Sequence, residues 1–391
     1  MQIRPLRQGD AEQAFQLRIS AFSDATRATY DADEIYAPDA HRLVAVDGHR
    51  VIGHLAVWPV QQAFLGTAVP MGAVSAFAIA HDQRGRGIGS GMLAAALDHM
   101  ADAGLPVSTL YPSTPVPYHR WGWEFAGEHV RRRVPTRALL EIPAPAGPVT
   151  LRPYEPADLD ALVEIRDRLA LAEPGALVGG RRWLARALQP DPDEPDLTVV
   201  AVRDARAAGL LLAAKTASDT SIYGLHLREV FGEDRDIERA LLRCVGHHHT
   251  VADATVLRSR PGDPLLYELA SLTRPDPDSE HFMTRLVDVP AAIAARAWPP
   301  VSAQVELDIT DDRRPGNGGR FVLEVGEGAA SLTPGGAGRA AIDVGALASL
   351  YTGFASAGGL ARAGRLRAGP DAVAALTEVF TAPAPAMRDT Y

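Results

Sequence analysis

A glycine-rich stretch carries the clearest chemistry in this sequence of 391 residues. It reads Gln83-Arg84-Gly85-Arg86-Gly87-Ile88-Gly89-Ser90-Gly91 and lies between an apolar segment, a predicted strand over 71–80, and an alanine-rich predicted helix over 88–103. Glycines let a backbone approach a ligand closely, and a helix N-terminus offers free N–H groups to an anion. Arg84 and Arg86 add charge-assisted hydrogen bonds to phosphate oxygens. The stretch therefore predicts a pyrophosphate site.

Such a turn has three other interpretations. A P-loop is disfavoured because no Lys-Ser or Lys-Thr follows the last glycine. A dinucleotide-binding turn usually opens the first strand–helix unit of a chain, whereas this one comes later. A purely structural turn is the remaining alternative.

The elements around this turn occur twice along the chain. Ile3-Arg4-Pro5 begins a strand, a proline turn and an amphipathic helix, and Leu151-Arg152-Pro153 begins a second such series. Self-similarity at this distance predicts a duplicated domain, joined by a proline-rich linker over 143–156. In the second copy, the turn between a predicted strand over 226–231 and a helix over 236–248 contains only Gly232.

The glycine stretch resembles the Arg-x-x-Gly-x-Gly pattern of Gcn5-related N-acetyltransferases (GNATs), with Arg84, Gly87 and Gly89 in the fixed positions. Over its whole length the chain resembles the Eis (enhanced intracellular survival) family of acetyltransferases. The matching pieces are Phe22-Ser23-Asp24, Ser75 to Ile79, Arg84 to Ile88, Tyr118-His119-Arg120-Trp121-Gly122-Trp123, Gly319-Arg320-Phe321 and Leu350-Tyr351.

The resemblance implies an α/β (α+β) fold of three domains. Residues 1–145 would form a catalytic GNAT domain, and residues 146–289 a second, degenerate GNAT domain. Residues 290–391 would form an α+β domain of the sterol-carrier-protein (SCP2-like) type. The loss of glycines in the second copy fits a domain that no longer binds coenzyme. The resemblance also implies a homo-oligomer, a hexamer.

The resemblance further implies acetyl-CoA as a substrate and assigns residues to it. In the family, the strand before the glycine turn leaves its neighbour, and its backbone pairs with the pantetheine amides. The residues expected to bind the coenzyme are Phe77, Ala78, Ile79, Arg84, Gly85, Arg86, Gly87, Ile88 and Gly89.

The catalytic groups also follow from the resemblance. Tyr118 would be the general acid, because a phenol of ordinary pKa near 10 is protonated at pH 7 and can donate to a departing thiolate. The α-carboxylate of the last residue, Tyr391, would be the base. Asp24 and Ser75 match substrate-binding positions, although Asp24 is equally well explained as a helix cap or loop aspartate. Thr390 replaces an acidic residue of the family, which weakens the case for polycationic aminoglycosides as acceptors.

Composition excludes several other classes of protein. A net charge of −9 argues against a nucleic-acid partner. No apolar stretch is long enough for a membrane span, and the N-terminus has no secretory signal, so a cytoplasmic protein is expected. No metal is expected, because the consecutive His247-His248-His249 point in different directions on a helix.

The sequence thus predicts an N-acetyltransferase that uses acetyl-CoA and a small primary amine: an aminoglycoside, a polyamine or a lysine-like acceptor. Two alternatives remain. One is a lipid-binding protein whose GNAT domains are vestigial, and the other is an acyl-CoA sensor that binds without turnover.

Overall fold

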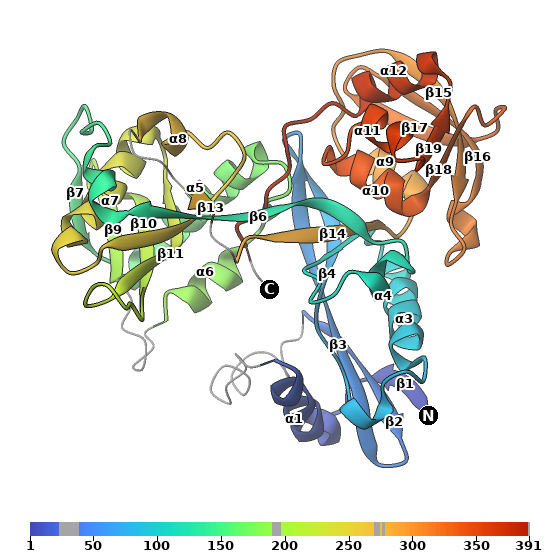
Figure 1. Ribbon diagram of the computed structural model, residues 1–391, viewed down its shortest axis with the longest axis horizontal. Coiled ribbons are helices and arrows are strands. Elements are labelled where there is room, and N and C mark those ends of the chain that lie inside the picture. The colour runs from blue at the N-terminus through green and yellow to red at the C-terminus, as the bar shows by residue number, and fades with distance from the viewer. Residues whose placement is uncertain (23–38, 190–196, 270–273, 276–277, 390–391) are drawn as a thin grey trace. The chain divides into compact units, whose positions relative to one another are not determined.

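The computed structural model describes residues 1–22, 39–189, 197–269, 274–275 and 278–389 (Figure 1). The chain folds into two compact units. Of the described residues, those within 1–127 and 281–383 form unit 1, and those within 128–280 and 384–389 form unit 2. The domain boundaries at 145 and 289 stay predictions. Among the described helices, none is long and apolar enough to cross a bilayer.

The first sheet of unit 1 contains six strands in the order β1-β2-β3-β4-β5-β14. All neighbours are antiparallel except β4 and β5, which are parallel. The strands are β1 (Gln2–Pro5), β2 (His41–Asp47), β3 (Arg50–Phe64), β4 (Thr67–Ile79), β5 (Val107–Leu110) and β14 (Glu280–Leu286). A turn at Asp47-Gly48 joins β2 and β3 as a hairpin.

Two helices flank the long strands β3 and β4 (Figure 1). Helix α1 (Ala11–Ala21) contributes Phe15 and Leu17 to the interior. Helix α3 (Ile88–Asp102) buries an apolar face that includes Met92, Leu93, Ala96, Leu97 and Met100. Since α3 begins directly after the glycine turn, burial of this face fixes the direction of the helix and therefore the position of its N-terminus.

The sheet of unit 2 repeats this arrangement, with strand order β6-β12-β11-β10-β9-β7. Its strands are β6 (Glu124–Pro135, in unit 2 from Glu128), β7 (Thr150–Pro153), β9 (Leu197–Arg203), β10 (Arg206–Thr216), β11 (Gly224–Gly232) and β12 (Ala254–Ser259). Its main helices are α5 (Leu159–Ala172) and α7 (Arg235–Gly246). The shorter elements are β8 (Leu177–Val178), α6 (Arg181–Ala187), α8 (Leu265–Glu268) and β13 (Arg274–Pro275).

The expected duplication is confirmed at the level of single hydrogen bonds. In the first copy, Arg4 binds both carboxylate oxygens of Asp10, at 2.6 and 2.9 Å, and Asp10 also accepts from the Arg7 backbone N–H. In the second copy, Arg152 binds Asp158 in the same way, at 2.7 Å to each oxygen, and Asp158 accepts from the Glu155 backbone N–H. Such a shared network indicates one ancestral unit used twice.

The last strand of each repeat comes from an unexpected part of the chain. Strand β6 follows the first repeat in sequence but pairs with β12 in the sheet of unit 2. Strand β14 follows the second repeat but pairs with β5 in unit 1, for example through Met283 and Leu110. The last strand in the sheet of each repeat is therefore supplied by the segment that follows the other repeat in sequence.

The third segment, residues 289–383, contributes a five-stranded sheet to unit 1. The strand order is β17-β16-β15-β18-β19, with strands β15 (Ala303–Thr310), β16 (Gly319–Gly326), β17 (Ala329–Pro334), β18 (Ala340–Asp343) and β19 (Leu366–Ala368). Its helices are α9 (Val289–Ala295), α10 (Val344–Thr352), α11 (Ala357–Arg362) and α12 (Pro370–Val379).

Candidate active site

Strand β4 leaves its parallel neighbour at mid-length. The described pairs between β4 and β5 run from Met71 to Ala73 and stop there. On its other edge, β4 stays paired with β3 as far as Ile79. The β5-side edge from Val74 to Ile79 thus has backbone groups outside the ladder, which an extended ligand could pair with. Phe77, Ala78 and Ile79 lie in this stretch.

A β-bulge marks the same region. The register with β3 shifts between His54 and Ala56, so that Ala76 and Phe77 together oppose Leu55, and Ala76 has a φ of 51°. Nδ1 of His54 lies 3.0 Å from the Ala76 carbonyl oxygen. Because a carbonyl can only accept, Nδ1 carries the proton, and burial lowers the pKa of His54 to about 4. A hydrogen bond from a neutral histidine therefore stabilises the bulge.

His54 was not among the residues that the sequence predicted for the site. Its signal was present, since it is a polar side chain in the middle of a strand that is otherwise apolar from Val51 to Trp58. Ser75, a predicted substrate-binding residue, lies next to the bulge and accepts a hydrogen bond of 3.0 Å from Nε1 of Trp58. That bond orients the serine hydroxyl beside the free edge of β4.

The glycine turn exposes the N-terminus of α3. Gly85 and Gly87 have φ values of 80° and 79°, and a Cβ at either position would meet no atom within 4 Å. Gly87 is the N-cap, and its carbonyl accepts the first helical bond, from Gly91 N–H at 3.1 Å. The N–H groups of Ile88, Gly89 and Ser90 precede that bond, so they are available to an anion. The side chain of Ile88 is buried in the core.

Two arginines add positive charge to this turn. Arg84 is exposed, and its Nε lies 3.5 Å from the Ile79 carbonyl. Arg86 is also exposed and donates to the side chain of Gln83. The neighbouring Asp82 is neutralised by a two-pronged contact with Arg50, at 2.6 and 2.7 Å. The turn therefore presents backbone donors and cationic side chains together, which suits a diphosphate.

Tyr118 lies on the short helix α4 (Val116–His119) and is 9% exposed. Its carbonyl accepts hydrogen bonds from Trp121 N–H and Trp123 N–H, at 2.9 and 3.1 Å, which fold the following residues back over it. Burial raises the pKa of Tyr118 to about 12. The phenol is therefore protonated throughout the neutral range and is suited to donate a proton.

One aromatic side chain connects the three parts of the site. The ring of Phe77 lies against that of Tyr118, with a centroid separation of 6.2 Å. Its Cζ atom is 3.3 Å from where a Cβ on Gly89 would lie. The free strand edge, the glycine turn and Tyr118 are thus brought together within unit 1. Asp24, Thr390 and Tyr391 lie outside the described residues.

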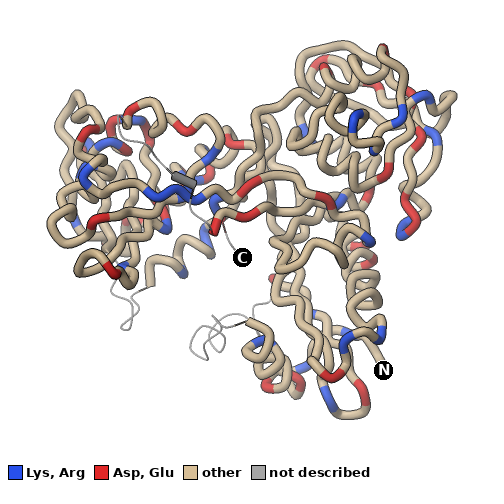
Figure 2. The backbone as a smooth tube through the Cα atoms, viewed as in Figure 1, with Lys and Arg blue, Asp and Glu red and all other residues tan. Residues whose placement is uncertain are grey.

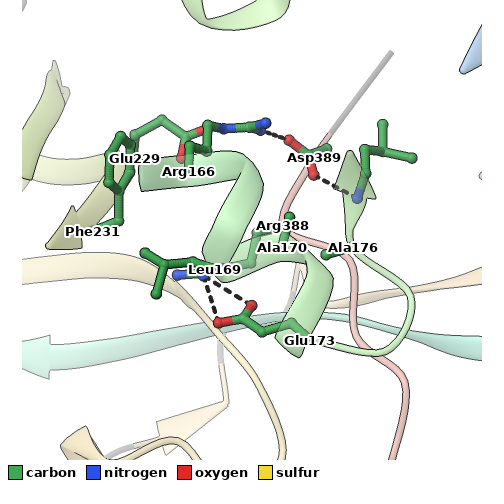
Figure 3. Close-up of a pocket in the computed structure, with 10 residues that line it drawn as sticks. Arg166, Leu169, Ala170, Glu173, Ala176, Glu229, Phe231, Arg388 and Asp389 are labelled. Atoms are coloured by element: carbon green, nitrogen blue, oxygen red, sulfur yellow. Dashed lines mark hydrogen bonds and ion pairs between the residues drawn. The ribbon is translucent and has the colours of Figure 1, made fainter. Parts of the chain in front are cut away.

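The chain near its C-terminus is anchored in unit 2 as far as Asp389 (Figure 3). Asp389 forms a buried ion pair with Arg166. Arg388 binds both carboxylate oxygens of Glu173 at 2.9 Å. Nδ1 of His129 lies 2.9 Å from the Met387 carbonyl oxygen. The first two of these contacts line the pocket drawn in Figure 3, and together the three contacts hold residues 387–389 in unit 2.

The corresponding helix N-terminus in unit 2 is unsuited to phosphate. Asp234 caps α7 by accepting a hydrogen bond of 3.1 Å from Ile237 N–H. Asp236 and Glu238 add two more carboxylates in the first turn. A Cβ on Gly232 would lie 2.9 Å from the Glu238 backbone nitrogen. Negative charge occupies the end of the helix where the first repeat offers free N–H groups, so only the first repeat has an anion site of this kind.

Over the other described residues, charges of both signs are interspersed. The arginines of β6 form a short run of positive charge among them (Figure 2). Within the part of the chain that the structure describes, no group of three or more His, Cys, Asp or Glu side chains gathers to hold a metal ion.

Comparison with known proteins adds independent observations. Residues 2–126 match the model of the acetyltransferase (GNAT) domain, and residues 289–388 match that of the sterol carrier protein domain. An uncharacterised N-acetyltransferase of Streptomyces coelicolor is 31% identical over 77% of this chain and 76% of its own. The N-acetyltransferase Eis of Mycobacterium bovis is 28% identical over 82% and 80%. A GCN5-related N-acetyltransferase from Anabaena variabilis has the same fold over the whole of both chains, with a TM-score of 0.92 and 23% identity.

Proposed function

Since the chain belongs to the Eis family of GNAT N-acetyltransferases and is therefore an acyltransferase, we propose that it transfers the acetyl group of acetyl-CoA to a primary amine. In this proposal the backbone of Phe77, Ala78 and Ile79 pairs with the pantetheine arm. The turn from Arg84 to Gly89 holds the diphosphate through its N–H groups and its two arginines.

The reaction needs one acid and one base. The amine nitrogen attacks the thioester carbonyl carbon, and the resulting tetrahedral intermediate collapses with cleavage of the carbon–sulfur bond. Tyr118 gives its phenolic proton to the departing sulfur and is later reprotonated from solvent. The α-carboxylate of Tyr391 accepts the proton that the attacking nitrogen loses. In the same proposal, Asp24 and Ser75 bind the acceptor.

One observation supports this proposal more than any other. Phe77 lies on the stretch of β4 that has left β5, and its ring contacts both Tyr118 and the start of α3. A thioester laid along that edge, with its diphosphate at Gly87, would have its reacting end beside a protonated phenol. No other feature of unit 1 gathers a donor backbone, an anion site and an acid in this way among the described residues.

The experiment is a thiol-release assay with acetyl-CoA and a panel of amines: aminoglycosides, polyamines, lysine peptides and arylalkylamines. We expect turnover with at least one class. Tyr118→Phe should lower kcat by roughly 10²- to 10⁴-fold, the usual contribution of a general acid. Deletion of Tyr391 should lower it as well. Full activity of the deletion variant would remove the carboxylate base from the mechanism, and full activity of Tyr118→Phe would remove the acid.

The lipid-binding alternative has less support. Side chains of the third segment pack against one another in its interior: the buried Arg296 lies 4.5 Å from the ring centre of Trp298 and 5.0 Å from that of Tyr351. The Tyr351 hydroxyl donates to the Ala292 carbonyl at 3.0 Å. Such packing favours a structural role for this segment. The cytoplasmic location and hexameric assembly stay predictions.

A further inference from the structure

The residues that follow the proposed acid are held by the third segment. The acid segment, Tyr118 to Glu124, carries the phenol at its first position. Arg313, in the turn after β15, donates from Nε to the Arg120 carbonyl at 3.0 Å. The same guanidinium lies 4.8 Å from the ring centre of Trp121. Arg313 therefore contacts both the backbone and a side chain of the acid segment.

A second contact lies at Gly122. This residue has a φ of 81°, and a Cβ there would lie 2.9 Å from Cγ1 of Val344 and 3.0 Å from Cζ of Arg285. Val344 is the first residue of α10. Arg285, on β14, is fully buried and ion-paired with Asp311 of the third segment. The acid segment thus lies directly on a side chain of α10 and on a buried guanidinium, with no room for a methyl group between them.

A third contact fixes the end of the acid segment. One carboxylate oxygen of Glu124 lies 3.1 Å from Nδ1 of His119. The other accepts a hydrogen bond of 2.9 Å from the Arg365 guanidinium. Arg365 also binds both carboxylate oxygens of Asp343, at 2.8 and 2.9 Å. Asp343 in turn caps α10 by accepting from Ala346 N–H. A chain of ion pairs and hydrogen bonds therefore runs from His119, the residue beside Tyr118, to the start of α10.

We propose that the third segment positions the general acid: Arg313, Val344 and Arg365 fix the acid segment so that the Tyr118 phenol points at the departing sulfur. This proposal rests on the proposed function and adds a role for the third segment. A proton donor acts only within hydrogen-bond reach, and misplacement of a reacting group by about 1 Å can cost up to 100-fold in rate. The arginines are positioning residues, because they act through Tyr118.

Arg313 and Arg365 can be substituted without creating a cavity in the core. Arg313 is exposed, and the Arg365 side chain is 43% exposed. Ion pairs at such sites contribute little to folding stability. Arg339 offers a matched control, because it forms an exposed ion pair with Glu306 at 3.0 Å in the same segment, away from the acid segment.

The first measurement is steady-state kinetics of Arg313→Met, Arg365→Met and the double variant of the full chain. We expect kcat to fall roughly tenfold or more in the double variant, with KM for acetyl-CoA unchanged, because the glycine turn is not touched. Arg365→Lys should recover part of the loss, and Arg339→Met should behave as the parent. An unchanged kcat in the double variant would overturn the proposal.

A double-mutant cycle separates positioning from general damage. If the arginines act through Tyr118, their loss should have little further effect in a Tyr118→Phe background, whereas independent effects multiply. Multiplicative losses would overturn the proposal while leaving the acetyltransferase intact. Loss of activity only in the Tyr118→Phe variant would support the proposed function and contradict the positioning role.

Hydrogen exchange of the peptide spanning 118–124 needs no turnover. Faster exchange in the double variant than in Arg339→Met is expected, and equal exchange would overturn the proposal even if no amine were accepted. Absence of turnover in the parent protein would instead overturn the proposed function.

Discussion

At the scale of single residues, burial decides which chemistry each side chain can perform. Tyr118 and His54 belong to the same site, and their pKa values shift in opposite directions. Burial raises the pKa of the phenol to about 12, so that it stays a proton donor, and lowers the pKa of the imidazole to about 4, so that it stays neutral. The neutral histidine can then hold the Ala76 carbonyl, and with it the bulge where β4 changes course.

The lowered pKa of His54 predicts an acid-sensitive fold. An unfolded chain has an ordinary histidine pKa near 6.5, so between pH 6.5 and 4 the unfolded state binds a proton that the folded state excludes. The free energy of unfolding should therefore fall as pH is lowered through this window. His54 alone would lower the free energy of unfolding by about 3 kcal/mol between neutral pH and pH 4.

Chemical denaturation at a series of pH values measures this dependence. His54→Gln should lower stability at pH 7, because the longer and more flexible amide side chain does not reproduce the position of the imidazole donor, but should flatten the slope between pH 6.5 and 4. The exposed His49→Gln is the matched control. An unchanged slope in His54→Gln would show that the acid sensitivity arises elsewhere, for example at His41 or His129, whose pKa values burial also lowers to about 4.

At the scale of elements, the site is the junction of one strand and one helix. The pairing of β4 with β5 ends at Ala73, and α3 begins at Ile88 with the free N–H groups of its first turn. The second repeat has the same elements, β11 and α7, but a carboxylate at its cap. The two repeats therefore share the same elements, and a few residues of one turn decide which of them offers an anion site.

Glycine substitutions at the two ends of α3 test this assignment. Gly87 and Gly104 both have positive φ, of 79° and 68°, with open space around them. Alanine at either should cost about 1 kcal/mol in stability, because an L-residue is strained there. Only Gly87→Ala should raise KM for acetyl-CoA, by roughly tenfold or about 1.4 kcal/mol, since its methyl group would lie where the diphosphate approaches. Equal KM values in the two variants would place the coenzyme elsewhere.

At the scale of the whole molecule, the repeats cannot be separated at their sequence boundary. Residues 1–145 include β5 but lack β14, which pairs with β5, and also lack the third segment of the same unit. A fragment of this length would expose a central strand as an edge and leave part of the core uncovered.

Residues 1–145 expressed alone should therefore fail to fold or aggregate, whereas co-expression with residues 146–391 should recover a folded complex with acetyltransferase activity. Circular dichroism and size-exclusion chromatography would follow both preparations. Cooperative thermal unfolding of the isolated fragment as a monomer would contradict this expectation.

The sequence by itself determined the parts whose physical cause is local. Glycines with positive φ and a following apolar helix specify the anion site, and the repeated Arg–Asp spacing specifies the start of each repeat. Only the tertiary structure decided what depends on distant pairing. The pairing of β14 with β5, the hold of His54 on Ala76 and the contacts of Arg313 and Arg365 with the acid segment join residues that no local pattern relates. Strand partners and contacts between residues far apart in sequence are selected by the fold as a whole, so they form only once the chain has folded.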